Sequence, residues 1–317
     1  MPRHPNYIPH GVIPAVLLPF DNDLAIDEQS FRKHLRDVAS VEGLSAITIN
    51  AHSTEVSSCT FDEQRSVLEI AQEEIGTKLP LINGIWADGS IEAARLARMA
   101  TQGGASALLV FPPTPFTLGQ SPQMALADFK RIADATDLPL IVFQYSLATG
   151  QGYPKDTLLK LCEEVPTIRA IKDWIGNVPH HEWAHPHAAK STAAGERAHH
   201  APRLAFLVAG ARPQWLVVRL RQRDCRFAGT AFRAVQRNDL AEAKRLNDGI
   251  EPIARVFYAD PFVDMHNRMK EALVLLGKLP RAVVRPPVAK IERAEIMRIR
   301  EALIEAGLLD KNARDAA

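Results

Sequence analysis

A lysine occupies a position where the surrounding pattern calls for a buried apolar side chain. The stretch TIRAIKDW, residues 167–174, resembles a buried β-strand, and Lys172 lies near its end. Burial removes water from an ammonium group and lowers its pKa, and a partly neutral lysine is a nucleophile toward carbonyl carbons. Lys172 is therefore a candidate for Schiff-base formation with a ketone. The alternative is that Lys172 lies at a strand end and extends its ammonium group into solvent.

A tyrosine at the end of the preceding apolar run favours the catalytic interpretation. Tyr145 ends the run LPLIVFQY, residues 138–145. A phenol close to an amine can shuttle protons during carbinolamine formation and carbon–carbon bond chemistry. Taken alone, Tyr145 would be interpreted as an aromatic side chain at a strand edge.

The elements that must position these two residues alternate between strands and helices. Nearly continuous apolar runs, typical of strands buried on both faces, occupy residues 11–20, 46–51, 80–87, 107–113, 138–145 and 167–174. Segments with helical spacing lie between them. Asp27, the capping-box pattern TFDE at 60–63 and Ser90 are the expected N-terminal caps of three of these helices.

Serial βα units predict an α/β fold with a parallel sheet, and a (β/α)8 TIM barrel is favoured over a doubly wound sheet. No G-x-G-x-x-G follows the first strand, and the unusual polar residues cluster at strand ends, where barrel active sites lie. The chain after about residue 230 is strongly helical. We therefore expect a barrel core over residues 1–232 and, over 233–317, a closing helix with a C-terminal helical extension.

Composition excludes several classes of partner. The 317 residues carry a net charge of +1 without a block of like charges, so nothing indicates nucleic acid or an anionic membrane. The apolar runs are too short to span a bilayer, and no signal peptide is visible. Cys59, Cys162 and Cys225 are scattered, which suggests a reduced, cytoplasmic protein.

Three segments carry a family resemblance. GVIPAVLLPFDNDLAID, FQYSLATG and AIKDW resemble the dihydrodipicolinate synthase/N-acetylneuraminate lyase family of class I aldolases, over residues 11–174 and again from about 232 to 290. The resemblance implies a (β/α)8 barrel in which Lys172 forms an imine with pyruvate or another 2-oxo acid and Tyr145 relays protons. It implies no cofactor and no metal, and suggests a homotetramer or homodimer.

The chain departs from the family pattern at the turn after the second strand. The family usually has G-T-T-G-E or G-S-T-G-E there, which holds the 2-oxo acid carboxylate, whereas this chain has AHSTE at 51–55. Ser53 retains a donor to the carboxylate. His52 either adds a donor or a base, or caps the turn. With Thr54, and with Thr149 from the segment SLATG, they are the expected substrate-binding residues.

Two absences bear on the substrate. Residues 111–116 lack the second tyrosine of dihydrodipicolinate synthase proper, and residues 146–154 lack its arginine for the aldehyde's carboxylate. Lysine biosynthesis is thereby disfavoured, and a 2-keto-3-deoxy sugar acid is preferred as substrate of an aldolase or dehydratase. The alternatives are a non-catalytic barrel that serves as a scaffold or metabolite-binding relic and, more weakly, a metal-dependent aldolase.

The resemblance stops between about residues 183 and 230. Residues 203–210 are the candidate seventh strand and 214–218 the eighth, but the interval leaves no room for a crossover helix. We expect atypical seventh and eighth units here. With suitable synonymous codons, residues 216–227 read one base later give LLSGSGSVIADL, which resembles the family, so we hypothesise an out-of-frame translation. A metal site formed by His180, His181, His185 and His187 is a weaker interpretation.

Overall fold

One parallel sheet organises the first half of the protein. The structure is a computed structural model that describes residues 2–174, 205–208, 234 and 237–310. Its six strands are hydrogen-bonded in chain order and comprise β1 (Ile47–Ile49), β2 (Leu81–Ile85), β3 (Ala107–Val110), β4 (Leu140–Gln144), β5 (Ile168–Asp173) and β6 (Ala205–Val208). All five neighbouring pairs are parallel. The expected α/β class is confirmed, and residues 205–208, within the candidate seventh strand at 203–210, form β6 beside β5.

The first predicted strand pairs with β1 only through isolated bridges. Val12 and Ala15 form isolated parallel bridges with Leu44 and Thr48. The Thr48 amide donates to the Pro14 carbonyl oxygen over 2.8 Å, but a proline has no N–H to return. The run at 11–20 therefore occupies the place of a first barrel strand without being a continuous one. The candidate eighth strand at 214–218 lies outside the described residues.

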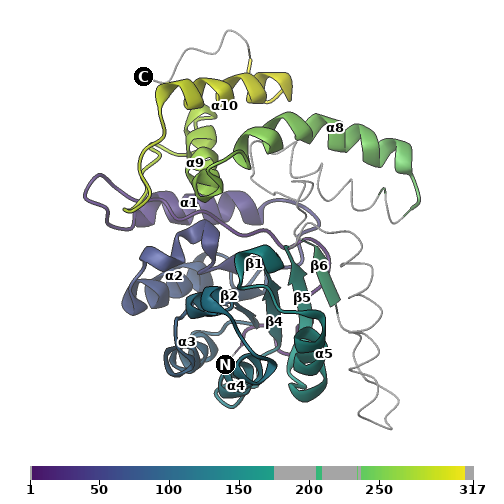
Figure 1. The fold of residues 1–317 in the computed structure, drawn as a ribbon. Coiled ribbons are helices and arrows are strands. Elements are labelled where there is room, and N and C mark those ends of the chain that lie inside the picture. The colour runs from purple at the N-terminus through teal and green to yellow at the C-terminus, as the bar shows by residue number, and fades with distance from the viewer. Residues whose placement is uncertain (1, 175–204, 209–233, 235–236, 311–317) are drawn as a thin grey trace.

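Helices separate the strands and cover the outer face of the sheet (Figure 1). They are α1 (Glu28–Ala39), α2 (Phe61–Glu74), α3 (Ser90–Gln102), α4 (Pro122–Ala133) and α5 (Lys155–Glu164). Asp27 caps α1, and the capping box of Thr60 and Glu63 opens α2, as expected. The expectation for Ser90 is wrong. Gly89 is the N-cap of α3, while the Ser90 hydroxyl donates to the Asp128 carboxylate over 2.6 Å.

Three further helices gather at one end of the molecule, beside α1 (Figure 1). They are α8 (Leu240–Phe257), α9 (Met265–Leu275) and α10 (Arg293–Glu305), joined in part by the short turn η5 (Phe262–Asp264). A hydrophobic cluster of their own holds them together, and Trp174 packs against it. The predicted boundary between residues 232 and 233 lies outside the described part of the chain, so this division stays a prediction.

The strand alternation directs Lys172 to the inner layer of the sheet. The register of β4 and β5 pairs Ile141 with Ala170, and both belong to the inner hydrophobic cluster. Side chains two residues apart on a strand share a face. Phe143 and Lys172, the register pair two residues further along each strand, therefore lie on that same inner face.

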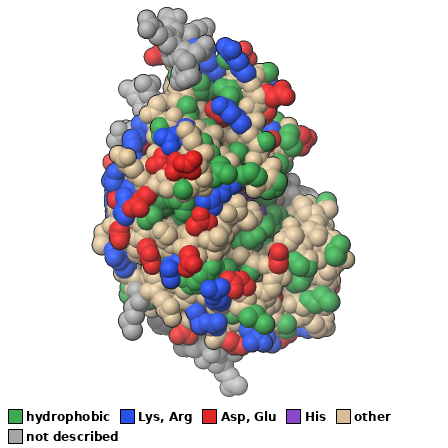
Figure 2. All heavy atoms as spheres, turned by 90° about the vertical axis from the view of Figure 1, so that its left-hand side faces the viewer, with side chains coloured by type: hydrophobic (Ala, Val, Ile, Leu, Met, Phe, Trp, Pro, Cys, Tyr) green, Lys and Arg blue, Asp and Glu red, His purple; other side chains and the backbone are tan. Residues whose placement is uncertain are grey.

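The surface carries both signs of charge. Figure 2 shows lysine, arginine, aspartate and glutamate side chains interspersed over the face that it presents. Among the residues described there, no continuous basic stripe of the kind that binds nucleic acid is seen. None of the helices in the described ranges combines the length and apolar character needed to cross a bilayer.

Candidate active site

Lys172 is half-buried at the carboxyl end of β5. Its ammonium nitrogen lies 5.1 Å from the centre of the Phe143 ring. The side chain retains a path to solvent, yet the surrounding protein atoms remove much of the ammonium hydration. This desolvation lowers the pKa of Lys172 to about 8. The amine is therefore reachable and has a neutral fraction near physiological pH, which are the two requirements of an imine-forming lysine.

His52 and Tyr145 form a hydrogen-bonded pair beside the lysine. His52 opens the 3-10 turn η1 (His52–Thr54) after β1, and Tyr145 directly follows β4. The His52 Nε2 is hydrogen-bonded to the Tyr145 hydroxyl. Burial, and secondly the charge of Lys172, lower the pKa of His52 to about 3, while burial raises the pKa of Tyr145. Both groups are thus neutral at pH 7, and the phenol donates to the imidazole.

Backbone constraints fix the turn that carries His52. Asn50 has a positive φ of 49°, and its side-chain amide donates to Asn83 over 2.8 Å. A Cβ on Gly84 would lie 1.8 Å from the Asn50 carbonyl oxygen, so only glycine allows this close approach of β2 to the turn. The Thr54 hydroxyl bridges the amide and the carbonyl of Ala51, each over 2.9 Å. The Thr54 hydroxyl is therefore committed to holding the turn.

Ser53 and Thr149 differ in their surroundings. Ser53 is buried, and its hydroxyl has no hydrogen-bond partner within the part of the chain that the structure describes. An unsatisfied buried hydroxyl is costly and marks a position where a ligand can bind. Thr149 is exposed in the turn η4 (Leu147–Thr149), and its hydroxyl donates to the Ser146 carbonyl over 2.7 Å. Substrate binding by these residues, and by His52 and Thr54, stays a prediction.

Aromatic side chains follow the ends of four consecutive strands. Trp86 comes directly after β2, Phe111 after β3, Tyr145 after β4 and Trp174 after β5. With Phe143 they form what we call the aromatic cluster. The His52 ring lies among them, with centroid distances of 4.7 Å to Phe111 and 6.0 Å to Trp174 at the extremes. Sequence reasoning missed this cluster, although an aromatic residue after each of these four strands was a visible signal.

A second histidine reaches the site from the C-terminal helices. His266 belongs to α9. Its pKa is lowered to about 3, mainly by burial and further by the charges of His52, Lys270 and Lys172. Lys270 of the same helix is paired with Glu55, which places α9 beside the turn that carries His52. Sequence reasoning missed His266, since no local pattern links residue 266 to the turn at residue 52.

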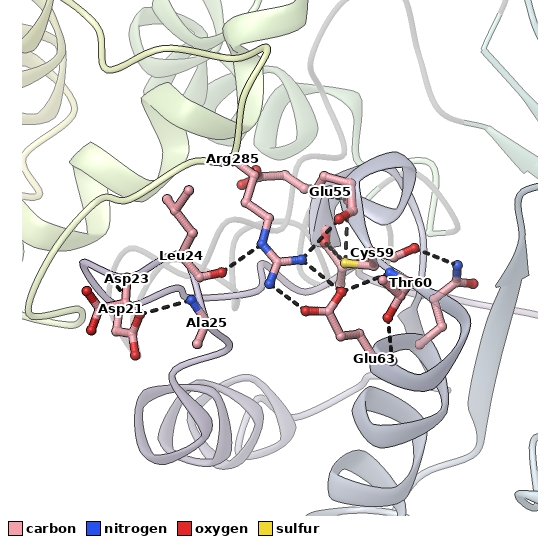
Figure 3. Close-up of polar contacts among 12 residues, drawn as sticks. Asp21, Asp23, Leu24, Ala25, Glu55, Cys59, Thr60, Glu63 and Arg285 are labelled. Carbon is pink, nitrogen blue, oxygen red and sulfur yellow. Dashed lines mark hydrogen bonds and ion pairs between the residues drawn. The ribbon is translucent and has the colours of Figure 1, made fainter.

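Glu55 ties this turn to the C-terminal part of the chain (Figure 3). Glu55 has a left-handed backbone, with a φ of 52°. Its carboxylate forms an ion pair with the fully buried Lys270 of α9 and accepts the Arg285 amide over 3.0 Å. The Lys270 ammonium also donates to the Val283 carbonyl over 2.8 Å. The glutamate of the AHSTE segment is thus an anchor of the turn.

The guanidinium of Arg285 extends the same connection. It donates to both carboxylate oxygens of Glu63 over 2.6 and 2.9 Å, and to the carbonyl oxygens of Ser58 and Leu24 over 3.0 and 2.9 Å (Figure 3). It also lies 4.3 Å from the centre of the Phe20 ring. Bidentate guanidinium–carboxylate pairs fix geometry as well as add energy. Arg285 therefore holds the start of α2 against the segment that follows α9.

Metal-ligating groups do not gather in the described ranges. No set of three or more histidine, cysteine, aspartate or glutamate residues there is arranged to hold a metal ion. The four histidines at 180, 181, 185 and 187 lie outside the described residues. The same holds for the interval 183–230 apart from β6, and for the out-of-frame hypothesis built on it.

Comparisons with known proteins place this arrangement in context. A model of the dihydrodipicolinate synthetase family matches residues 8–306. The 4-hydroxy-tetrahydrodipicolinate synthase of Bartonella henselae is 24% identical over 308 residues, covering 94% of this chain and 98% of that protein. The corresponding enzyme of Rhodopseudomonas palustris is 28% identical over 301 residues, covering 95% and 97%.

A solved structure extends the comparison to the fold. Dihydrodipicolinate synthase from Thermotoga maritima superposes with a TM-score of 0.79 at 17% identity, covering 96% of this chain and all of that one. This likeness, together with the parallel sheet and the helices after residue 240, confirms the expected (β/α)8 barrel with a C-terminal helical extension.

Proposed function

The chain belongs to the dihydrodipicolinate synthetase family, and from this membership we propose that it is a Schiff-base lyase, an aldolase or dehydratase, acting on a 2-oxo acid. The observation that carries the proposal is the half-buried Lys172, with a pKa of about 8, beside the hydrogen-bonded Tyr145 and His52. At pH 7 about a tenth of such amines are neutral.

The proposed reaction begins at the Lys172 nitrogen. The neutral amine attacks the ketone carbon of the 2-oxo acid, and loss of water gives an imine. Loss of a proton from C3 turns the imine into an enamine, a carbon nucleophile. The Tyr145 phenol gives and takes the protons of these steps, and the neutral His52 imidazole accepts the phenolic hydrogen bond. Ser53, whose buried hydroxyl lacks a described partner, donates to the substrate carboxylate.

The proposed 2-oxo acid is pyruvate or a 2-keto-3-deoxy sugar acid, since both reach the same imine and enamine. The curated relatives are named 4-hydroxy-tetrahydrodipicolinate synthases. This chain lacks a tyrosine in 111–116 and an arginine in 146–154, so we do not propose that reaction for it. We propose a homo-oligomer, a dimer or tetramer, located in the cytoplasm, on the family resemblance alone.

Borohydride trapping with pyruvate tests the proposal. Reduction of the imine should add a stable mass to the peptide that contains Lys172. Lys172→Ala and Lys172→Arg should both abolish trapping and turnover, because a guanidinium stays protonated. Lys244, with a side chain 75% exposed, supplies the control, and Lys244→Ala should trap like the parent.

The outcome separates the proposed lyase from a non-catalytic barrel. Trapping needs only imine formation and is independent of the aldehyde partner. An adduct that persists in Lys172→Ala would remove the assignment of Lys172. No adduct in the parent at any pyruvate concentration would favour the non-catalytic barrel.

A further inference from the structure

His266 of α9 lies between two contacts that join the C-terminal part of the chain to the site. Four residues before it, the Phe262 ring of η5 lies 5.2 Å from the Trp174 ring, centre to centre. Four residues after it, Lys270 forms its ion pair with Glu55. Trp174 directly follows β5, and Glu55 directly follows the turn η1. The backbone at His266 is therefore held between the end of β5 and that turn.

The charges that act on His266 agree with this placement. Burial lowers its pKa most, and the charges of His52, Lys270 and Lys172 lower it further. His52 opens the turn η1, and Lys172 lies two residues before Trp174. Because the effect of one charge on another falls with the distance between them, His266 is close to both the turn and the imine-forming amine.

The imidazole of His266 is available to a ligand. Its side chain is half-buried, and neither of its ring nitrogens forms a hydrogen bond with another residue of the described ranges. The neighbouring His52, in contrast, is bonded to Tyr145. With a pKa of about 3, the His266 ring is neutral at pH 7 and presents one N–H donor and one acceptor nitrogen.

The cations that the C-terminal part brings to the turn are already committed. Lys270 is bound to Glu55, and Arg285 is bound to Glu63. Lys172 is the amine that the proposed imine occupies. A protonated imine carries the positive charge that balances a substrate carboxylate, so neutral hydrogen-bond donors suffice to hold that carboxylate.

The turn η1 itself leaves few donors for a carboxylate. The amides of Thr54, Glu55 and Val56 donate to carbonyl oxygens of the same turn. The Thr54 hydroxyl bridges the amide and the carbonyl of Ala51. The buried Ser53 hydroxyl has no partner within the described part of the chain. A carboxylate has about four lone-pair sites, so binding by Ser53 leaves room for a second side-chain donor.

We infer that His266 is this second donor, and that its N–H binds the carboxylate of the 2-oxo acid held at Lys172, together with the Ser53 hydroxyl. This inference deepens the proposed function and rests on it. It makes α9 part of the substrate site, in addition to its part in anchoring the turn at Glu55. The contact is a hydrogen bond, so the proposed imine chemistry is unchanged.

Two ketones that differ by the carboxylate test the inference on the full-length protein. Acetone has a methyl group where pyruvate has its carboxylate, and both form an imine that borohydride reduces. Trapping over a series of ketone concentrations, at a fixed reaction time, gives the concentration for half-maximal trapping. For pyruvate, His266→Phe should raise this concentration by roughly tenfold or more, as for loss of a hydrogen bond to a charged group. For acetone it should not change.

Two further variants serve as controls. His266→Gln keeps an N–H donor and should trap pyruvate at concentrations between those of His266→Phe and the parent. His10 is exposed, and its Nδ1 is hydrogen-bonded to the Ile8 carbonyl over 2.7 Å. His10→Phe makes the same change of side chain away from the site and should trap both ketones like the parent.

The failures of the two proposals are distinguishable. If His266→Phe traps pyruvate like the parent, the assignment of His266 is overturned and the Schiff-base lyase stands. Equal losses for pyruvate and acetone would also overturn it, because they would indicate a disturbed amine. If the parent does not trap acetone, the pyruvate series decides, and a His266→Gln variant as weak as His266→Phe overturns the donor role. Absence of pyruvate trapping in the parent would overturn both proposals.

Discussion

The His52 imidazole is hydrogen-bonded to the Tyr145 hydroxyl, although 93 residues separate them along the chain. His52 lies in the turn after β1 and Tyr145 directly follows β4. The strands are parallel, so both residues lie at the same carboxyl edge of the sheet. Because the pKa of His52 is lowered to about 3, the imidazole accepts this bond as a neutral group throughout the physiological range. The pair is therefore suited to hold a phenol ready for proton transfer.

Removing the phenol should slow turnover more than it weakens binding. We expect Tyr145→Phe to lower kcat by about 10²–10⁴-fold, the range of a positioned acid–base group. His52→Phe should lower kcat less, and the double variant should match Tyr145→Phe, because His52 acts through the tyrosine. A double-mutant cycle on kcat checks this. Additive losses, or near-parental turnover in Tyr145→Phe, would contradict it.

The lowered pKa of Lys172 should make the free energy of unfolding depend on pH. Folding lowers this pKa from 10.5 to about 8, so between those values the unfolded chain binds a proton that the folded chain does not. Stability should rise with pH across that window and be lowest below it. We therefore expect Lys172→Met to raise the free energy of unfolding at pH 7, with a gain that disappears toward pH 10.5. Urea titrations at several pH values measure it.

The control for this pH dependence is Lys244→Met, since Lys244 is largely exposed. Its effect on the free energy of unfolding should not vary across the window from about 8 to 10.5. In the parent, kcat/KM should rise with pH up to about 8 and then level. A pH-independent effect of Lys172→Met would show that Lys172 titrates normally.

Substitution of Ser53 should weaken substrate binding, whereas substitution of the adjacent Thr54 should lower the stability of the fold. Ser53→Ala should weaken 2-oxo acid binding by about 0.5–3 kcal/mol, as for loss of a hydrogen bond to a charged group. It should leave the free energy of unfolding unchanged, because the Ser53 hydroxyl has no partner in the described residues. Thr54→Val should destabilise the fold by about 1–3 kcal/mol, because it leaves the Ala51 amide unsatisfied. Trapping at graded pyruvate concentrations and thermal unfolding distinguish the two.

Breaking the Glu55–Lys270 pair should be costly. Lys270 is fully buried, and a buried charge that loses its partner typically destabilises a protein by about 3–5 kcal/mol. Glu55→Gln should show that loss in urea unfolding, and adding Lys270→Met should recover part of it. Asp248→Asn breaks the exposed pair with Lys244 and should cost less than about 1 kcal/mol. Similar values for Glu55→Gln and Asp248→Asn would refute the anchoring role.

The interval 183–230 yields a prediction about the gene. If those residues are translated out of frame, the codons for residues 175–235 read one base later should encode text that resembles the family. Resequencing that stretch decides it. A protein made from the corrected frame should be more stable and more active than this chain. Stop codons or unrelated text in the shifted frame would end the hypothesis.

The sheet could be predicted because its strands are buried on both faces. The runs that became β1 to β4 are mostly apolar, so local composition alone marks them, whereas β5 also carries Arg169, Lys172 and Asp173. The first run was less regular than expected because Pro14 cannot donate to the ladder. The cap at Ser90 failed because its hydroxyl bonds to Asp128 on the neighbouring helix, a contact that no local pattern reveals.

Part of the site was foreseeable for the same reason. Lys172 and Tyr145 end adjacent strands of a parallel sheet, and the carboxyl ends of such strands meet at one edge. His266 and Lys270 were not foreseeable, because they approach that edge from α9 through tertiary packing. Glu55 ends the AHSTE segment, and nothing local to that segment points to its buried partner, which lies 215 residues away.

The anchoring of Glu55 also sets an order of events during synthesis. The amide that Glu55 accepts belongs to Arg285, 230 residues later in the chain. At about 5–20 residues per second, roughly 10–50 s of translation separate the two. The turn that carries His52 therefore emerges from the ribosome long before its anchor exists. A nascent chain that stops short of Arg285 would already contain Lys172 while the neighbouring turn is still unanchored.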